Sequence, residues 1–161
     1  MPALTEVKLN ISSKAFQHGG EIPLKYSCEG ESINPPLDIE GLPEETKSLS
    51  IIVEDPDAPN GTFVHWVCFN VDPTRHIKEN HQPGMSGHNG AGKTGYRGPC
   101  PPSGSHRYFF KVYALNTKLN VQEGIEAEPL KEAMERHTVG FGEIMGRYQK
   151  KGNNPGNSQS I

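Results

Sequence analysis

Glycine and proline residues divide this chain into short segments, and most of these segments alternate apolar and polar residues with a period of two. Apolar side chains alternate in this way over residues 5–11 and 48–54, which predicts strands with one face in a core. Over residues 62–71 and 106–115 both faces carry apolar side chains, which is typical of central strands covered on both sides. The pattern therefore predicts a mainly β protein with strands at these four places.

One segment changes from this pattern to a helical period. Apolar or half-apolar residues recur there at i, i+3, i+4 and i+7, namely Leu130, Ala133, Met134 and His137. The spacing predicts a helix near residues 129–137, and Pro129 suits its first turn because the missing N–H has no partner there. We interpret His137 as a residue of the buried helix face rather than as a ligand. Gly140 can end the helix, and residues 141–148 are expected to form a last strand.

The chain has 161 residues, enough for one domain with a hydrophobic core, which we place at residues 1–150. Residues 151–161 are polar and rich in glycine and asparagine, and we expect them to form a disordered tail. Residues 1–15 contain neither the apolar stretch of a signal peptide nor a membrane span. These features predict a cytoplasmic protein without stable membrane insertion.

The three cysteines are odd in number and far apart, at Cys28, Cys68 and Cys100. They form no C-x-x-C pair, so their spacing indicates neither a disulfide framework nor a zinc knuckle. The histidines of the middle segment, His76, His81 and His88, also lack the i,i+4 helical frame of a metal site. We therefore expect reduced thiols, no metal and no cofactor.

The net charge of −3 argues against a non-specific nucleic-acid-binding protein, because affinity for the phosphate backbone requires a basic face. The distribution of charge is uneven. Acidic residues predominate over 29–57, whereas basic residues predominate over 75–111. A locally positive middle segment favours an anionic ligand, and a solvated basic loop is the alternative interpretation.

Residues 87–94 read GHNGAGKT and match G-x-x-x-x-G-K-[ST], the phosphate loop of nucleotide hydrolases. Such a loop holds phosphates only when a buried strand precedes it and a helix N-terminus follows. The preceding residues 76–86 show no alternation, and the prolines that follow forbid a regular helix. We therefore interpret this motif as a loop without a nucleotide.

Two motifs carry the chemistry that we consider relevant. In the first, DPDAP over residues 55–59 forms a stiff turn between two predicted strands, so that Asp55 and His65 can meet at one end of a sheet. In the second, GPCPPSGSHRY begins with a rigid loop and runs into a strand on which His106 and Tyr108 share a face.

His106 reaches the same end of the sheet as His65 if their two strands run parallel. Parallel strands require a long crossover, and residues 72–105 provide one. Two imidazoles, a phenol and the Gly98 N–H would then supply mainly hydrogen-bond donors, which suits a small oxyanion. Asp55 would orient a histidine or meet a cationic part of the ligand. The alternative is that both histidines are satisfied residues of a β core.

DPDAP followed by a strand with His65, together with GYRGPCPPSGSHRYFFKVYAL, resembles the two signature regions of the phosphatidylethanolamine-binding protein family. The likeness extends over residues 16–148, and the compact length is similar to the bacterial and archaeal branch. The resemblance implies a Greek-key-type β-sandwich with a few peripheral helices, and a pocket for phosphate or phosphorylethanolamine-like groups. It also supports a cis peptide bond between Ala58 and Pro59. By motif position the pocket would be lined by Asp55, Pro59, His65, Gly98, Pro99, Pro101, His106 and Tyr108.

The leading functional hypothesis is therefore a small-anion or phospho-group binding module that regulates a kinase or another protein partner. The alternative is a serine protease inhibitor that acts through the rigid loop at residues 98–105. We do not expect an enzyme, because no serine or cysteine stands in a nucleophile frame such as G-x-S-x-G. The chain lacks the C-terminal helical extension of the animal proteins, and the sequence leaves open whether it forms a homodimer.

Overall fold

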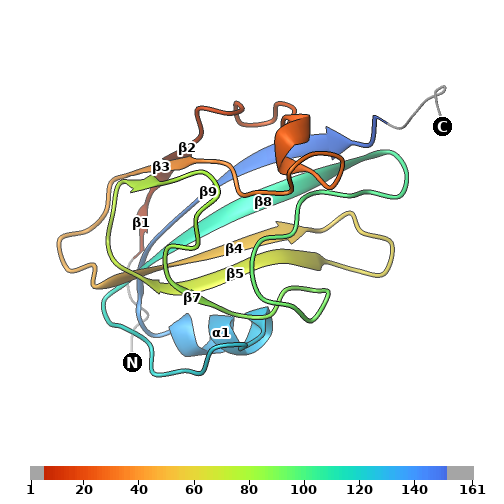
Figure 1. The fold of residues 1–161 in the computed structure, drawn as a ribbon. Coiled ribbons are helices and arrows are strands. Elements are labelled where there is room, and N and C mark those ends of the chain that lie inside the picture. The colour runs from red at the N-terminus through yellow and green to blue at the C-terminus, as the bar shows by residue number, and fades with distance from the viewer. Residues whose placement is uncertain (1–5, 152–161) are drawn as a thin grey trace.

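The computed structural model describes residues 6–151, and its regular secondary structure consists mainly of strands in two β-sheets (Figure 1). The larger sheet has the strand order β1-β9-β8-β4-β5-β7, and the smaller sheet has the order β2-β3-β6. In chain order the elements are β1 (Val7–Lys8), β2 (Asn10–Ser12), the 3-10 helix η1 (Leu24–Tyr26), β3 (Leu37–Glu40), β4 (Ser48–Asp55), β5 (Phe63–Val71), β6 (His76–Ile77), β7 (Met85–Ser86), β8 (Ser105–Leu115), α1 (Ala127–Met134) and β9 (Thr138–Gln149). The expected mainly β fold is confirmed. The expected tail lies, beyond residue 151, outside the described residues.

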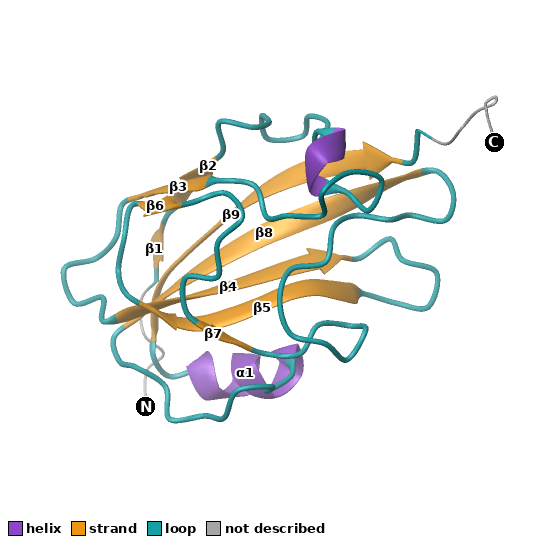
Figure 2. Ribbon diagram, in the orientation of Figure 1, coloured by secondary structure: helices purple, strands orange, loops and turns teal. Residues whose placement is uncertain are grey.

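The main core lies between the two sheets, where Ile51 of β4 packs in one cluster with Ile39 of β3. Alternate residues of the larger sheet face the other way, and Ile52 packs with Leu130 and Met134 of α1. Figure 2 shows α1 lying beside β5 and β7. The central strands are thus covered on both sides, which explains why both of their faces are apolar in the sequence.

The order of the central strands decides where the two sequence motifs meet. β4 pairs antiparallel with β5 on one side and with β8 on the other. β5 and β8 therefore run in the same direction, as the sequence predicts, but β4 lies between them and they do not pair directly. The C-terminal end of β4 and the N-terminal ends of β5 and β8 lie at one end of the sheet, which brings Asp55, His65 and His106 together.

The predicted strand at residues 5–11 is instead two short strands in different sheets. β1 pairs parallel with β9, and β2 pairs antiparallel with β3. Leu9 lies between them, with its side chain 1% exposed and its N–H donating to Phe141 O. The chain crosses from one sheet to the other at Leu9, and the alternation of apolar residues continues through this change of partner.

The helix and the last strand are confirmed, with different boundaries. α1 ends at Met134, where the N–H of His137 and the hydroxyl of Thr138 both donate to the Met134 carbonyl oxygen. Gly140 does not end the helix, because it lies within β9 opposite Ala114 of β8. β9 extends over Thr138–Gln149 and is longer than the strand expected at residues 141–148.

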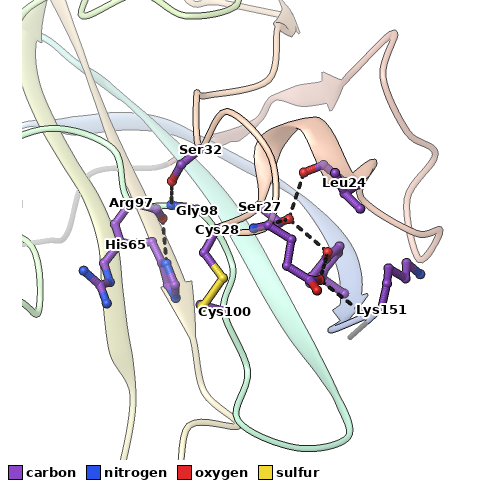
Figure 3. The surroundings of a disulfide bond; sticks show 11 residues. Leu24, Ser27, Cys28, Ser32, His65, Arg97, Gly98, Cys100 and Lys151 are labelled. Atoms are coloured by element: carbon purple, nitrogen blue, oxygen red, sulfur yellow. Dashed lines mark hydrogen bonds between the residues drawn. A yellow bond between two sulfur atoms is a disulfide. The ribbon is translucent and has the colours of Figure 1, made fainter. Parts of the chain in front are cut away.

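Two expectations about covalent structure are wrong. Cys28 and Cys100 form a disulfide, with their Cα atoms 5.4 Å apart (Figure 3). Cys68 is a free buried thiol. The two residues are 72 apart in the sequence and meet only through the fold, so their spacing could not reveal the pair. No peptide bond between described residues is cis, so the Ala58–Pro59 bond is trans. None of the helices between residues 6 and 151 is both long and apolar enough to cross a bilayer.

The glycine-rich loop at residues 87–94 is closed on itself. The Asn89 side-chain oxygen accepts hydrogen bonds from the N–H groups of Ala91 and Lys93, and the Gly92 N–H donates to the Asn89 carbonyl. The only strand directly before the loop is the two-residue β7, and no helix follows it before α1 in the described chain. The amides that would hold phosphates in a nucleotide loop are therefore occupied within the protein.

We expect magnesium ATP to show no measurable binding at this loop, and Lys93→Ala to leave calorimetric titrations with ATP unchanged from those of the wild type. The reason is that neither a helix N-terminus nor free amides are present to hold the phosphates. Micromolar binding of ATP that disappears in Lys93→Ala would contradict this interpretation.

Candidate functional site

A pocket of about 150 Å³ opens where β4 ends and where β5 and β8 begin. Its walls come from the DPDAP turn, from the start of β5, from the proline-rich loop before β8 and from the start of β8. The lining residues are Asp55, Ala58, Pro59, Phe63, His65, Arg97, Cys100, Pro101, Pro102, His106 and Tyr108. The structure thus brings together six of the eight residues expected from the sequence, and Gly98 and Pro99 are the two that do not line the cavity.

Asp55 orients His106. Its Oδ2 lies 2.7 Å from His106 Nδ1, and both side chains are buried, with residue exposures of 3% and 7%. Asp55 Oδ1 accepts the backbone N–H of Asp57 at 2.8 Å, which closes the DPDAP turn. Because a carboxylate only accepts hydrogen bonds, the His106 Nδ1 carries a proton and the Nε2 is the ring nitrogen left for the pocket. Both Asp55 oxygens are engaged within the protein, which favours the orienting role over contact with a ligand cation.

His65 is oriented in a similar way by the backbone. Its Nδ1 lies 2.7 Å from the carbonyl oxygen of Arg97, and the Arg97 N–H donates to the His65 carbonyl at 2.9 Å (Figure 3). A carbonyl only accepts, so His65 Nδ1 carries the proton and Nε2 is free. Burial lowers the pKa of His65 below its usual value, so the ring is neutral at pH 7.

Tyr108 lies between the two imidazoles. Its ring centroid is 5.2 Å from that of His65 and 6.4 Å from that of His106. The residue is fully buried, and its hydroxyl makes no hydrogen bond of good geometry to any described residue. Burial raises the pKa of this hydroxyl well above its usual value, and the Asp55 carboxylate is close enough to raise it further. Tyr108 thus offers a neutral, unsatisfied hydroxyl, a group that is costly to bury unless a ligand or water meets it.

Gly98 and Pro99 hold the pocket wall from behind. The Gly98 N–H, expected to face the ligand, donates instead to Ser32 Oγ at 2.9 Å, and the Pro99 carbonyl accepts the N–H of Cys28 at 3.0 Å. A Cβ atom at Gly98 would lie 2.4 Å from the Tyr26 carbonyl oxygen. Glycine is therefore required here because two loops pack in direct backbone contact.

These two motifs also identify the family. The profile of the phosphatidylethanolamine-binding protein family matches residues 12–149 of this chain. The chain belongs to this family.

Relatives in the family come from archaea and bacteria. A UPF0098 protein of Archaeoglobus fulgidus is 52% identical over 144 residues, which cover 84% of this chain and 50% of that protein. A UPF0098 protein of Methanothermobacter thermautotrophicus is 45% identical over 150 residues, which cover 88% of this chain and 99% of that protein. This chain therefore spans half the length of the first relative and nearly all of the second. Neither of these names states an enzymatic activity.

Two solved structures of the family have the same fold. One is described as a putative phosphatidylethanolamine-binding protein homolog, CT736 of Chlamydia trachomatis, with a TM-score of 0.86 and 43% identity over 89% of this chain and 99% of that one. The other is YbcL of Escherichia coli, described as a new member of the mammalian family, with a TM-score of 0.82, 28% identity and the same two coverages. The similarity over nearly the whole of both chains confirms the fold class.

Sequence reasoning missed five residues of the pocket, namely Ala58, Phe63, Arg97, Cys100 and Pro102. Arg97 matters most among them because it is exposed at the rim and carries a permanent charge, with its guanidinium carbon 5.9 Å from the Phe63 ring centroid. The signal was present in the sequence, since Arg97 directly precedes the GPCPP motif.

Arg107 lies on the opposite face of β8 from His106, where it binds Asp57 of the DPDAP turn. Its Nε and Nη2 each lie 2.9 Å from an Asp57 carboxylate oxygen, and its backbone N–H donates to the same carboxylate. The hydrogen bond from Arg107 lowers the pKa of Asp57 to about 2. Two aspartates of one turn thus bind neighbouring residues of β8.

A larger cleft of about 840 Å³ lies on the face of the sheet that α1 covers. Its buried carboxylate, Glu54, is paired with Lys111 at 2.8 Å and with Lys131 at 2.7 Å. Burial opposes ionisation of Glu54, but the two lysines outweigh it and lower the pKa of the carboxyl. Because these charges satisfy one another, the smaller pocket with its unpartnered Tyr108 hydroxyl is the better candidate for a ligand site.

Proposed function

We propose that this protein binds a small oxyanion, such as phosphate or the phosphoryl group of a phosphate monoester, in the pocket between His65 and His106. The observation that carries the proposal is that both imidazoles are fixed through Nδ1, which leaves two Nε2 atoms and the Tyr108 hydroxyl without partners among the described residues. With a proton on Nε2, each ring becomes a donor to an anion.

The charges around the pocket support an anion over a cation. The Asp55 carboxylate is held by His106 and by the turn, so that both of its oxygens are engaged within the protein rather than left to attract a cation. Arg97 adds a permanent positive charge at the rim. Charge-assisted hydrogen bonds to a phosphate oxygen are stronger than neutral ones.

The size of the pocket limits the ligand. A cavity of about 150 Å³ holds a molecule the size of benzene. This is sufficient for a phosphate or a phosphorylated headgroup, whereas an acyl chain would have to remain outside. We therefore propose headgroup-sized anions as ligands.

We expect sulfate to bind the wild type at pH 6 and His106→Ala to weaken this binding by roughly tenfold or more, because a hydrogen bond to a charged group contributes about 1.5–3 kcal/mol. Isothermal titration calorimetry measures both constants, and phosphorylethanolamine serves as a second probe. His76→Ala is the matched control, because His76 lies at an exposed ion pair with Asp38. Equal sulfate affinity of a folded His106→Ala and the wild type would disprove the proposed site.

We expect Arg97→Gln to weaken sulfate binding by no more than about fivefold, because an exposed charge pair contributes roughly 1 kcal/mol or less. The loss should be the same at every pH from 5 to 8, since the guanidinium is always protonated. Arg75→Gln, which removes another exposed arginine, is the control. Calorimetry across this pH range would contradict the assignment if the Arg97→Gln loss grew or vanished with pH.

A second candidate function is protease inhibition, and the observation that favours it is the bracing of an exposed loop by a disulfide. Residues 102–105 are exposed and begin two positions after Cys100. A rigid loop loses less conformational entropy when it enters a protease than a flexible one does. Chymotrypsin-like and elastase-like proteases test this function, since stoichiometric inhibition without cleavage supports it and cleavage after Pro102 or Ser103 excludes it.

A further inference from the structure

One side of the pocket is formed by residues 97–102, which we call the proline wall. The first half of the wall is held by hydrogen bonds. The N–H groups of Arg97 and Gly98 donate to the His65 carbonyl and to Ser32 Oγ, and the Pro99 carbonyl accepts the N–H of Cys28. The second half, which faces the cavity, consists of Cys100, Pro101 and Pro102. No hydrogen bond joins this half to other described residues, and its two prolines have no N–H to donate. The disulfide at Cys100 is therefore the covalent tie of the part that touches a ligand.

The other end of this tie lies on a rigid part of the fold. Cys28 follows Ser27, a fully buried residue whose Oγ is hydrogen bonded to the Leu24 carbonyl and to the Tyr148 hydroxyl of β9 (Figure 3). The disulfide thus connects the proline wall to Cys28, whose neighbour Ser27 is hydrogen bonded to β9. Cys28 is an exposed residue and Cys100 is half-buried, so the disulfide lies near the surface.

We propose that the thiol–disulfide state of Cys28 and Cys100 controls the affinity of the pocket for an oxyanion. This inference rests on the proposed function, and it adds a form of regulation to that site. With the disulfide intact, Pro101 and Pro102 are fixed against His65 and His106, and the pocket is ordered before a ligand arrives. After reduction, a ligand has to order this part of the wall itself, and that cost weakens binding.

The chemical step is a two-electron reduction. The bond between the two sulfur atoms breaks, Cys28 and Cys100 each gain one electron and one proton to become thiols, and dithiothreitol loses two electrons and two protons to form its cyclic disulfide. Linkage then requires reciprocity. If reduction weakens anion binding by some factor, bound anion makes the disulfide harder to reduce by the same factor.

The experiment compares sulfate titrations of the oxidised protein, the protein reduced with dithiothreitol, and Cys28→Ser, all at pH 6. We expect about tenfold weaker binding in both the reduced protein and the variant, which is within the usual range of coupling between sites. Dithiothreitol should have no effect on Cys28→Ser, which controls for the reductant. In saturating sulfate, half of the wild type should be reduced only at a ratio of reduced to oxidised dithiothreitol that is higher by the same factor.

Near-ultraviolet circular dichroism verifies that each form is folded. If the reduced forms unfold, Ser32→Ala tests the same wall with the disulfide intact, because it removes the acceptor of the Gly98 N–H; it too should weaken sulfate binding. If the reduced protein is folded and binds sulfate as tightly as the oxidised protein, redox control is overturned and the proposed function stands. If the reduced forms unfold, equal sulfate affinity of Ser32→Ala and the wild type has the same consequence. Failure of the oxidised protein to bind sulfate would overturn both.

Discussion

Cys28→Ser is expected to lower the free energy of unfolding by about 4 kcal/mol, because a cross-link between residues this far apart removes much of the loop-closure entropy of the unfolded chain. The disulfide joins residues 72 apart in the sequence. Urea denaturation under oxidising conditions measures the loss. The single tryptophan, Trp66, is a suitable probe because it is 1% exposed in the folded state.

The reductant supplies the control for this measurement. Dithiothreitol should destabilise the wild type by a similar amount and should leave Cys28→Ser unchanged, because that variant no longer has the disulfide on which the reductant acts. A loss below about 1 kcal/mol, or a wild type whose stability is insensitive to dithiothreitol, would show that the cross-link contributes little.

The disulfide also changes the argument about cellular location. Reduced thiols were expected alongside a cytoplasmic location, and the expectation of reduced thiols is wrong for Cys28 and Cys100. Disulfides persist in oxidising compartments and also in intracellular proteins of hyperthermophiles. Whether the disulfide is formed therefore depends on the compartment in which the protein works, and the proposed redox control of the pocket depends on it too.

The central strands could be predicted from the sequence because each one lies against two layers. Residues such as Val67 and Cys68 face opposite sides of β5, and both are fully buried. This arrangement leaves a clear pattern of apolar residues on both faces. Alternation shows which side chains of a strand share a face, but not which strand pairs with it. The division of the N-terminal strand at Leu9 could therefore not be predicted from the pattern.

The candidate site was predictable in part for a similar reason. His65 and His106 each stand near the start of a strand, so that strand direction alone brings them to one end of the sheet. The Cys28–Cys100 pair and the inward turn of Gly98 towards Ser32 depend on how two loops pack together. Such packing follows no period in the sequence, and neither feature could be derived from spacing.

Sulfate affinity is expected to increase by tenfold or more between pH 8 and pH 5.5. Burial lowers the pKa of His65, so its ring is neutral at pH 7 and presents an unprotonated Nε2. An anion stabilises the imidazolium and raises the pKa of the bound ring, so binding takes up a proton. Between the depressed pKa of the free ring and the higher pKa of the complex, each proton taken up gives a slope of about one order of magnitude in affinity per pH unit. The gain should level off below the depressed pKa of the free ring.

Calorimetric titration of sulfate from pH 5 to pH 8 tests this dependence, and sulfate is preferable to a phosphate monoester because the latter loses charge near its second pKa of about 6. His65→Ala should flatten the slope, because it removes the ring that takes up a proton. Arg97→Gln should lower affinity and keep the slope, because its charge does not change with pH. A pH-independent affinity in the wild type would mean that the imidazoles do not carry the charge that holds the anion. The rim arginine and the Tyr108 hydroxyl would then have to account for binding without them.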